Sequence, residues 1–443
     1  MTRRMTRREL LRLGGLGSVM LLAAACQPKV VEKEVTKVVK EVVEVVKEVT
    51  PEPAPKGKTE IIYYDRTSDA TRWGERFNEV QDQIELSVEI QPPGTRYEQL
   101  VAAITAGNAP DVIGLDCVQV GRFAGIGALA PLDDLIEPGI RDKYFQHLIS
   151  TPGHFGSFRG ELLGVPFWID MSVIYYNKAF LQEAGGDPDK GLQSWDEIIE
   201  YGKGATKEGQ FGVSLGRINI FISGPYVWAQ GGDYVNEDWT ESLLDQPSHV
   251  NMLKFFRDIV CVHKITNDAP GTSWGEMNDI FTGKRAMMVH SGGGFVGLIR
   301  REFPELWEVL GVCPIPGPKV GQKSSFIGGN VASITTQTKN KQEAGEFLLW
   351  VTASDEGMAV TGDIGFLPGC PSGLDLPVYQ KDKAIYEPFR DGLEKGYPSW
   401  NHPLYEELQN PLEVAWMDAV LGEKDMDEIV DKCHEEVNRI LHR

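Results

Sequence analysis

The stretch LLGVPFWIDMSVIYYNK, residues 162–178, decides the fold that the sequence predicts. It contains a β-branched and aromatic run at 173–176, which follows a proline-containing lead-in and ends at Asn177 and Lys178. Such a run is typical of a buried strand. We therefore expect a strand at this point, followed directly by a helix over residues 179–184.

The chain before this stretch alternates between strand and helix patterns. Strands are predicted at 61–64, 86–90 and 111–115, with helices at 71–80 and 97–106 between them. Alternation at this spacing predicts an α/β sheet with mostly parallel strands. Ligands of such sheets sit beyond the carboxyl ends of the strands. The candidate side chains at those ends are Tyr64, Asp65, Arg66 and Asp116.

Several short motifs follow one another along the chain. They include GNAPD at 107–111, GVP and YYNK within 162–178, SWDEI at 194–198, FTGKRAM at 281–287 and YPSW at 397–400. In this order the motifs resemble the family 1 extracellular solute-binding proteins, the maltose-binding-type receptors of ABC importers. The resemblance extends from about residue 59 to residue 443.

The resemblance implies an α/β fold of the two-lobed periplasmic-binding-protein type (type II), hinged, with three crossings between the lobes. The N-terminal lobe would comprise residues 59–171 and 327–368, and the C-terminal lobe residues 172–326 and 369–443. In this family the segment that corresponds to 162–178 crosses between the lobes along the floor of the ligand cleft.

The same resemblance implies a set of cleft residues. Sugars offer flat C–H faces and a rim of hydroxyls, so aromatic rings combined with Asp, Asn and Arg side chains suit them. For Trp168 and Trp228, packing in the core is an equal alternative. The further candidates for ligand binding are Trp168, Asp170, Tyr226, Trp228, Trp274, Ser291, Gly292, Gly293, Gly328 and Trp400.

The glycines at 292–297 match the pattern G-x-G-x-x-G, placed between a predicted strand and a predicted helix. We reject a dinucleotide site, because the motif lies well inside the chain and Glu302 and Glu305 fall in the following helix rather than at a second strand end. A turn that presents backbone N–H groups to ligand hydroxyls explains the glycines as well. No cofactor is expected.

The first 26 residues resemble an export signal. Arg7-Arg8 and the apolar run 13–25, which is too short to span a bilayer, resemble a twin-arginine leader. The run ends in LAAAC, a lipobox-like sequence with Cys26 as the expected lipidation site, although Ala23 stands where the family pattern usually has leucine. A leader that is cleaved elsewhere or retained is the alternative.

Residues 27–58 form a valine-, glutamate- and lysine-rich stalk that ends in prolines. A solvated spacer is the favoured interpretation, and a coiled coil with weak self-association is the alternative. The valines at heptad-like spacing are Val31, Val35, Val38, Val42, Val45 and Val49.

Charge and cysteine content exclude several classes of function. The leader carries five arginines and one glutamate, a net +4, so the net −20 of the whole chain becomes −24 after Cys26. A protein this acidic repels nucleic acid and anionic lipid. The cysteines at 117, 261, 313, 370 and 433 show no zinc-site spacing, so we expect no metal and mainly small buried side chains.

The sequence therefore predicts a lipid-anchored receptor at the cell surface or in the periplasm, which binds a carbohydrate and delivers it to ABC permease subunits. An uncharged ligand is preferred, because the cleft segments contain only Arg66 and Arg217 as evident cations. Receptors for a polyol or a glycerol phosphodiester are alternatives. An exported glycoside-acting enzyme that uses Asp65, Asp116 or Asp170 is the alternative from another class, but no catalytic motif supports it.

Overall fold

The computed structural model describes residues 57–91, 95–142, 155–267, 272–398, 402 and 404–443. The leader, Cys26, the stalk up to residue 56 and Trp400 lie outside the described residues. None of the helices in the described part combines the length and the apolar character needed to cross a membrane.

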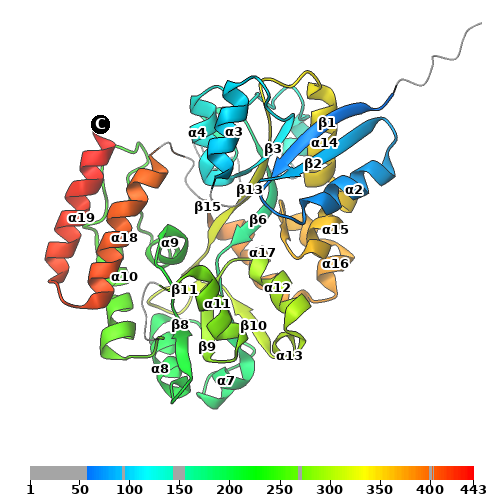
Figure 1. The fold of residues 1–443 in the computed structure, drawn as a ribbon. Helices are drawn as coiled ribbons and strands as arrows, with labels where there is room; N and C mark the ends of the chain where they lie inside the picture. The colour runs from blue at the N-terminus through cyan, green and yellow to red at the C-terminus, as the bar shows by residue number, and fades with distance from the viewer. Residues whose placement is uncertain (1–56, 92–94, 143–154, 268–271, 399–401, 403) are drawn as a thin grey trace, which may run out of the picture. The chain divides into compact units, whose positions relative to one another are not determined.

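The first of two main sheets has seven strands within the described residues, in the order β14-β6-β13-β3-β1-β2, with β15 beside β13 (Figure 1). Strands β1, β2 and β3 pair in parallel, whereas β13 is antiparallel to β3 and β6. The strands are β1 (Thr59–Asp65), β2 (Ile84–Ile90), β3 (Val112–Asp116), β6 (Val165–Met171), β13 (Phe326–Ile334), β14 (Leu367–Pro368) and β15 (Tyr397–Pro398).

The second sheet has four described strands in the order β10-β7-β9-β8. Strand β9 is antiparallel to β7 and parallel to β8. The strands are β7 (Val173–Asn177), β8 (Phe211–Ser214), β9 (Ala286–Ser291) and β10 (Leu310–Cys313). Short two-stranded pairs add β4 (Ser157–Phe158) with β5 (Glu161–Leu162), and β11 (Ile315–Pro316) with β12 (Lys323–Ser324).

Helices contact both sheets. Those whose residues pack with the first sheet are α2 (Ala70–Val80), α3 (Arg96–Thr105), α4 (Val120–Gly125), α14 (Lys341–Ala353) and α15 (Asp355–Ile364). Those that follow or pack with the second sheet are α7 (Lys178–Glu183), α8 (Trp195–Ala205), α9 (Ile220–Trp228), α10 (Pro247–Arg257), α11 (Trp274–Thr282), α12 (Gly294–Glu302), α13 (Pro304–Trp307), α17 (Lys383–Lys395), α18 (Tyr405–Leu421) and α19 (Met426–Leu441). The remaining short elements are η1 (Cys117–Gln119), α5 (Pro138–Ile140), η3 (Asp258–Val262), η4 (Pro371–Asp375) and α16 (Pro377–Gln380).

One expectation about the strands is wrong. The sheets are mixed rather than mostly parallel, because β6 and β13 enter the first sheet in opposite directions. The proline-containing lead-in at 165–171 is itself a strand, β6, and it belongs to a different sheet from β7. Pro166 is tolerated there because the register between β6 and β13 shifts beside it, which leaves a local irregularity in the ladder.

The chain passes from the first sheet to the second at Ser172. The backbone N–H of Ser172 donates to the carbonyl oxygen of Phe326 at 3.0 Å, and the N–H of Phe326 donates to Ser172 Oγ at 2.8 Å. The outgoing and returning crossings are therefore hydrogen-bonded to each other. Strand β15, a piece of the C-terminal segment, also returns to the first sheet beside Phe326.

The hydrophobic core consists of three clusters. One lies between the first sheet and helices α2, α14 and α15, and one between the second sheet and helices that include α8, α10 and α18. The third contains Ile169 and Met171 of β6 together with Val173 and Tyr175 of β7, so it extends across the crossing at Ser172. The cysteines at 117, 313, 370 and 433 are buried as expected, and Cys261 is partly exposed.

Candidate ligand-binding site

A cavity of about 260 Å³ lies where strand ends of the first sheet face helices of the second. Arg66 and Asp116 directly follow or end β1 and β3, and Asp170 comes from β6. Helix α9 contributes its N-cap residue and Phe221, and α11 contributes its first residue. The lining residues are Arg66, Asp116, Val118, Asp170, Asn219, Phe221, Trp274, Phe326, Gly328, Gly329 and Tyr405.

The wall from the first sheet is polar and charged. Arg66 Nη1 pairs with Asp116 Oδ2 at 2.8 Å, and the guanidinium carbon lies 5.0 Å from the ring centre of Trp168. Burial alone would lower the pKa of Arg66, but Asp116 and other nearby acidic groups outweigh it and raise that pKa. Burial raises the pKa of Asp170, and the Arg66 charge opposes this rise.

The wall from the second sheet is aromatic. Trp274 of α11 is 40% exposed, and its ring centre lies 5.3 Å from that of Phe221 of α9. The Phe221 ring lies in turn 5.2 Å from that of Phe326, the first residue of β13 in the first sheet. A capping box between Ser273 and Glu276 fixes the start of α11 and with it the position of Trp274.

Glycines form the floor. Gly328 faces Asp170 across the β13–β6 ladder. Gly329 has φ +127, and a Cβ built on it would overlap the carbonyl oxygen of Trp168. Only glycine suits this position, and its bare backbone keeps the cavity open between the two walls.

Comparison with known proteins identifies the family. The model for bacterial extracellular solute-binding proteins matches residues 72–387. The chain belongs to this family. The family recognised from the sequence motifs is thus confirmed. Its members are binding proteins found outside the cytoplasm, in the periplasm or at the cell surface.

Three similar proteins illustrate the range of ligands named in this family. The arabinooligosaccharide-binding protein of Halalkalibacterium halodurans is 27% identical over 357 residues, which cover 76% of this chain and 77% of the relative. The sn-glycerol-3-phosphate-binding periplasmic protein UgpB of Escherichia coli K12 is 23% identical over 383 residues, 77% of this chain and 82% of the relative. The sugar-binding protein MalE of Xanthomonas citri has a TM-score of 0.76 at 19% identity, covering 87% of this chain and 98% of that one. The predicted two-lobed, hinged α/β fold is confirmed by this likeness.

Five of the predicted site residues line the cavity of this solute-binding protein: Arg66, Asp116, Asp170, Trp274 and Gly328. The lining residues that were not predicted are Val118, Asn219, Phe221, Phe326, Gly329 and Tyr405. The sequence contained a signal for the position of Asn219, because an Asn directly before an apolar helix turn is a typical N-cap. Its side chain accepts from the N–H of Ile222 at 3.2 Å.

Asp65 lies under the cavity floor and is 1% exposed. Its carboxylate accepts hydrogen bonds from the Tyr63 hydroxyl and from the N–H of Thr67 at 2.8 Å. Burial raises the pKa of Asp65. Gly114 makes the space, because a Cβ there would overlap this carboxylate. Tyr64 does not line the cavity, and a hydrogen bond to Glu89 raises its pKa.

Three predicted aromatic residues lie in the core rather than in the cavity lining. Trp168 is 4% exposed and stacks on Phe366 at 4.3 Å between ring centres, beneath Arg66. Tyr226 packs against Phe256 at 4.9 Å. Trp228 stacks on Tyr397 at 4.3 Å.

The glycine turn after β9 lies behind the cavity. Ser291 is fully buried, and a Cβ on Gly292 would overlap the Asp170 carboxylate. A Cβ on Gly293 would meet Leu367 at 2.7 Å. None of these three residues lines the cavity, and Gly292 lies against Asp170, which does.

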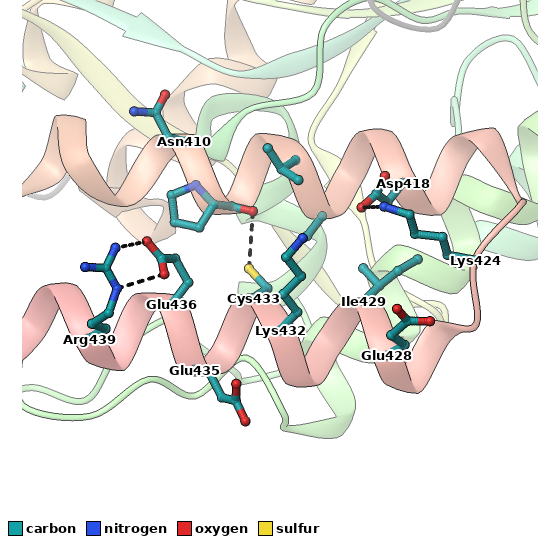
Figure 2. A pocket seen from close by; sticks show the side chains of 13 residues that line it. Asn410, Asp418, Lys424, Glu428, Ile429, Lys432, Cys433, Glu435, Glu436 and Arg439 are labelled. Carbon is teal, nitrogen blue, oxygen red and sulfur yellow. Dashed lines mark hydrogen bonds and ion pairs between the residues drawn. The ribbon is translucent and has the colours of Figure 1, made fainter.

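A larger pocket of about 490 Å³ lies between α18 and α19 (Figure 2). Two ion pairs join charged residues of its rim, one between Asp418 and Lys424 at 2.7 Å and one between Glu436 and Arg439. It contains none of the predicted site residues and shares no lining residue with the cavity at the strand ends. Within the described residues, no group of three or more His, Cys, Asp or Glu side chains is arranged to hold a metal ion.

Proposed function

We propose that this solute-binding protein binds an uncharged mono- or oligosaccharide in the cavity between its two sheets and delivers it to the permease of an ABC importer. The observation that carries the proposal is the pairing of unlike walls. Arg66, Asp116 and Asp170 stand on one side, and Phe221 and Trp274 on the other.

These walls suit the two kinds of surface on a sugar. Hydroxyls donate to carboxylates and accept from a guanidinium, and such charge-assisted hydrogen bonds are about twice as strong as neutral ones. The C–H faces of the ring pack on aromatic side chains. The sugar ligand in the names of the arabinooligosaccharide-binding relative and of MalE supports the same assignment.

The charge of the cavity favours a neutral ligand. The described lining has two carboxylates, Asp116 and Asp170, and one guanidinium, which Asp116 already pairs. An anionic group would meet an excess of negative charge. Arg217, the second cation considered from the sequence, pairs with Glu413 outside this cavity. This favours a sugar over the ligand class named for UgpB.

The same proposal includes the site of attachment and a role without catalysis. Lipidation at Cys26 would hold the receptor at the membrane, residues 27–58 would act as a spacer, and the lobes 59–171 with 327–368 and 172–326 with 369–443 would close on the ligand. A Cys26→Ser variant should move from the membrane fraction to the soluble fraction. Retention at the membrane would contradict the anchor.

A binding assay tests the ligand class. The mature chain is titrated in a calorimeter with arabino- and malto-oligosaccharides and with sn-glycerol 3-phosphate, and its melting temperature is followed in parallel. We expect heat and a raised melting temperature with at least one sugar, because a ligand of the folded state stabilises it. A response to the phosphate alone would contradict the proposal, and hydrolysis of a bound sugar would contradict the non-catalytic role.

A further inference from the structure

Helix α12 starts directly after β9 of the second sheet, and the turn that leads into it lies against a carboxylate of the first sheet. Its N-cap residue is Gly293, which has no side chain to cap the helix. The carboxylate of Asp170, on β6, lies against this turn, and the backbone N–H groups of Gly294 and Gly293 help to oppose the rise that burial causes in its pKa. A carboxylate near a helix start interacts favourably with the helix dipole and with N–H groups that lack a partner within the helix.

The fit between the two parts is close. A Cβ on Gly292 would overlap the Asp170 carboxylate, so the turn can approach β6 only as glycine. Tyr175 of the neighbouring strand β7 donates its hydroxyl to the carbonyl oxygen of Gly292 at 2.8 Å, which fixes the turn from the other side.

The second half of α12 also contacts an element that packs with the first sheet. Arg300 Nη2 donates to the carbonyl oxygen of Gly362 at 3.0 Å, and Arg301 Nη1 to that of Ile364 at 2.9 Å. These carbonyls belong to the last turn of α15, and that of Gly362 also accepts from the N–H of Gly365 at 3.1 Å. A Cβ on Gly297 would lie 2.6 Å from Gly365 Cα, so the backbones nearly touch.

The apolar face of α12 also packs against the other lobe. Phe295, Val296 and Ile299 are buried in a cluster that contains Phe281 of α11 and Val289 of β9 as well as residues of β6 and β14. Thus α12 is packed into the second lobe by its side chains and tied to the first lobe at both of its halves.

The position of Asp170 explains why such ties are compatible with movement. Asp170 lies two residues before Ser172, where the outgoing and returning crossings are hydrogen-bonded. Close to a hinge axis, displacements are small even when the lobes rotate as bodies.

We propose that α12 is the pivot of the hinge and that Asp170 is the positioning residue that couples it to the cavity. The carboxylate lines the cavity and also lies against the turn that starts the pivot helix. When the carboxylate is displaced or removed, the lobes sample a wider range of angles. The part of this inference that concerns a ligand rests on the proposed function, whereas the part that concerns the pivot does not.

The test measures lobe orientation without ligand. Nitroxide labels are attached at Arg122→Cys on α4 and Lys203→Cys on α8, both exposed positions, in a Cys261→Ser background because the other cysteines within the described residues are buried. Pulsed electron resonance then gives the distribution of distances between the labels. Gly292→Ala displaces the carboxylate from the second lobe's side, and Asp170→Ala removes it.

We expect both variants to broaden the distribution. The double variant should match Asp170→Ala alone, because the added methyl group then has room, and such non-additivity identifies a shared contact. Gly294→Ala is the matched control, since its Cβ would face the Phe366 ring at 3.2 Å instead of Asp170. It should keep the wild-type width.

A wild-type width for Gly292→Ala, or additive broadening in the double variant, would overturn the proposal. Should Gly292→Ala fail to fold, Asp170→Asn keeps the shape of the side chain and is expected to broaden the distribution less than Asp170→Ala. A merely structural contact would lower the melting temperature of these variants and leave the width unchanged. Because no ligand is present, failure of this inference and failure of sugar binding are distinguishable.

Discussion

Arg66 is held in place by contacts that the sequence could indicate only in part. The rule that ligands sit beyond strand ends selected Arg66, Asp116 and Asp65 alike. The alternation of side chains along β1 then places Asp65 inside and leaves Arg66 beside the cavity. The phase of that alternation depends on the partner strand and on the space left by Gly114, which the residues of β1 alone do not reveal.

Arg66→Ala should lower sugar affinity by about tenfold to a hundredfold, because a hydrogen bond to a charged group is worth roughly 1.5–3 kcal/mol. The loss also leaves Asp116 and Asp170 without the cation between them. Titration calorimetry measures the change. Arg217→Ala is the matched control, since Arg217 pairs with Glu413 outside the cavity. Equal losses for the two variants would contradict the assignment of the site.

Substitutions of Trp274 and Trp228 should separate an effect on sugar binding from an effect on stability. Trp274 is 40% exposed and lines the cavity, so Trp274→Ala should weaken sugar binding with little change in unfolding free energy. Trp228 is 8% exposed and stacks on Tyr397, so Trp228→Ala should cost about 3–5 kcal/mol of unfolding free energy. Urea unfolding and calorimetry of both variants check this. If Trp274→Ala bound sugar with the affinity of the wild type, the aromatic wall would not be part of the binding site.

At the scale of elements, the strand and helix pattern was largely predictable and the partners of the strands were not. Helix 71–80 and strand 86–90 appear as α2 and β2 with nearly the same bounds. The stretch 162–178 is apolar on both sides of Ser172, so no change of pattern marks the point where the chain leaves one sheet for the other. The glycine turn was predicted to face ligand hydroxyls, but its N–H groups face Asp170, which lies far away along the chain.

Strand β9 carries a buried histidine that should make the protein sensitive to acid. Burial lowers the pKa of His290 to about 3, and no hydrogen-bond partner is found for either ring nitrogen within the described residues. The unfolded chain takes up the proton below pH 6.5, while the folded chain takes it up only near pH 3. Stability is therefore present above pH 6.5 and is lost as the pH falls toward 3, at about 1.4 kcal/mol per unit.

A His290→Leu variant should be less sensitive to acid than the wild type between pH 6.5 and pH 4. Comparison of the two chains isolates the histidine from buried carboxyls such as Asp65, whose raised pKa acts in the opposite direction. Unfolding free energy from urea titrations at several pH values is the measurement. Parallel pH profiles for the two chains would show that His290 is not responsible.

At the scale of the molecule, the two lobes follow from a chain that builds one sheet, crosses, builds a second and returns. The family motifs were sufficient to predict this architecture, because they occur in order over most of the chain. They were less informative about the cavity, since no motif marks Phe221 of the aromatic wall, or Phe326 beside it, as a ligand residue. A ligand in this cavity would touch both lobes and would favour the state in which they are closest.

Sugar binding should therefore narrow the distribution of distances between labels at residues 122 and 203 and shift it to shorter values. The closed state would be held by contacts of the sugar with Arg66 and Asp116 on one lobe and with Phe221 and Trp274 on the other. Neither set of contacts alone can therefore close the hinge. A Trp274→Ala chain at the same sugar concentration should keep the ligand-free distribution, because it lacks part of the second wall. If the sugar raised the melting temperature of the wild type but left its distances unchanged, the ligand would be held by one lobe only. In that case the pivot at α12 would have no part in binding.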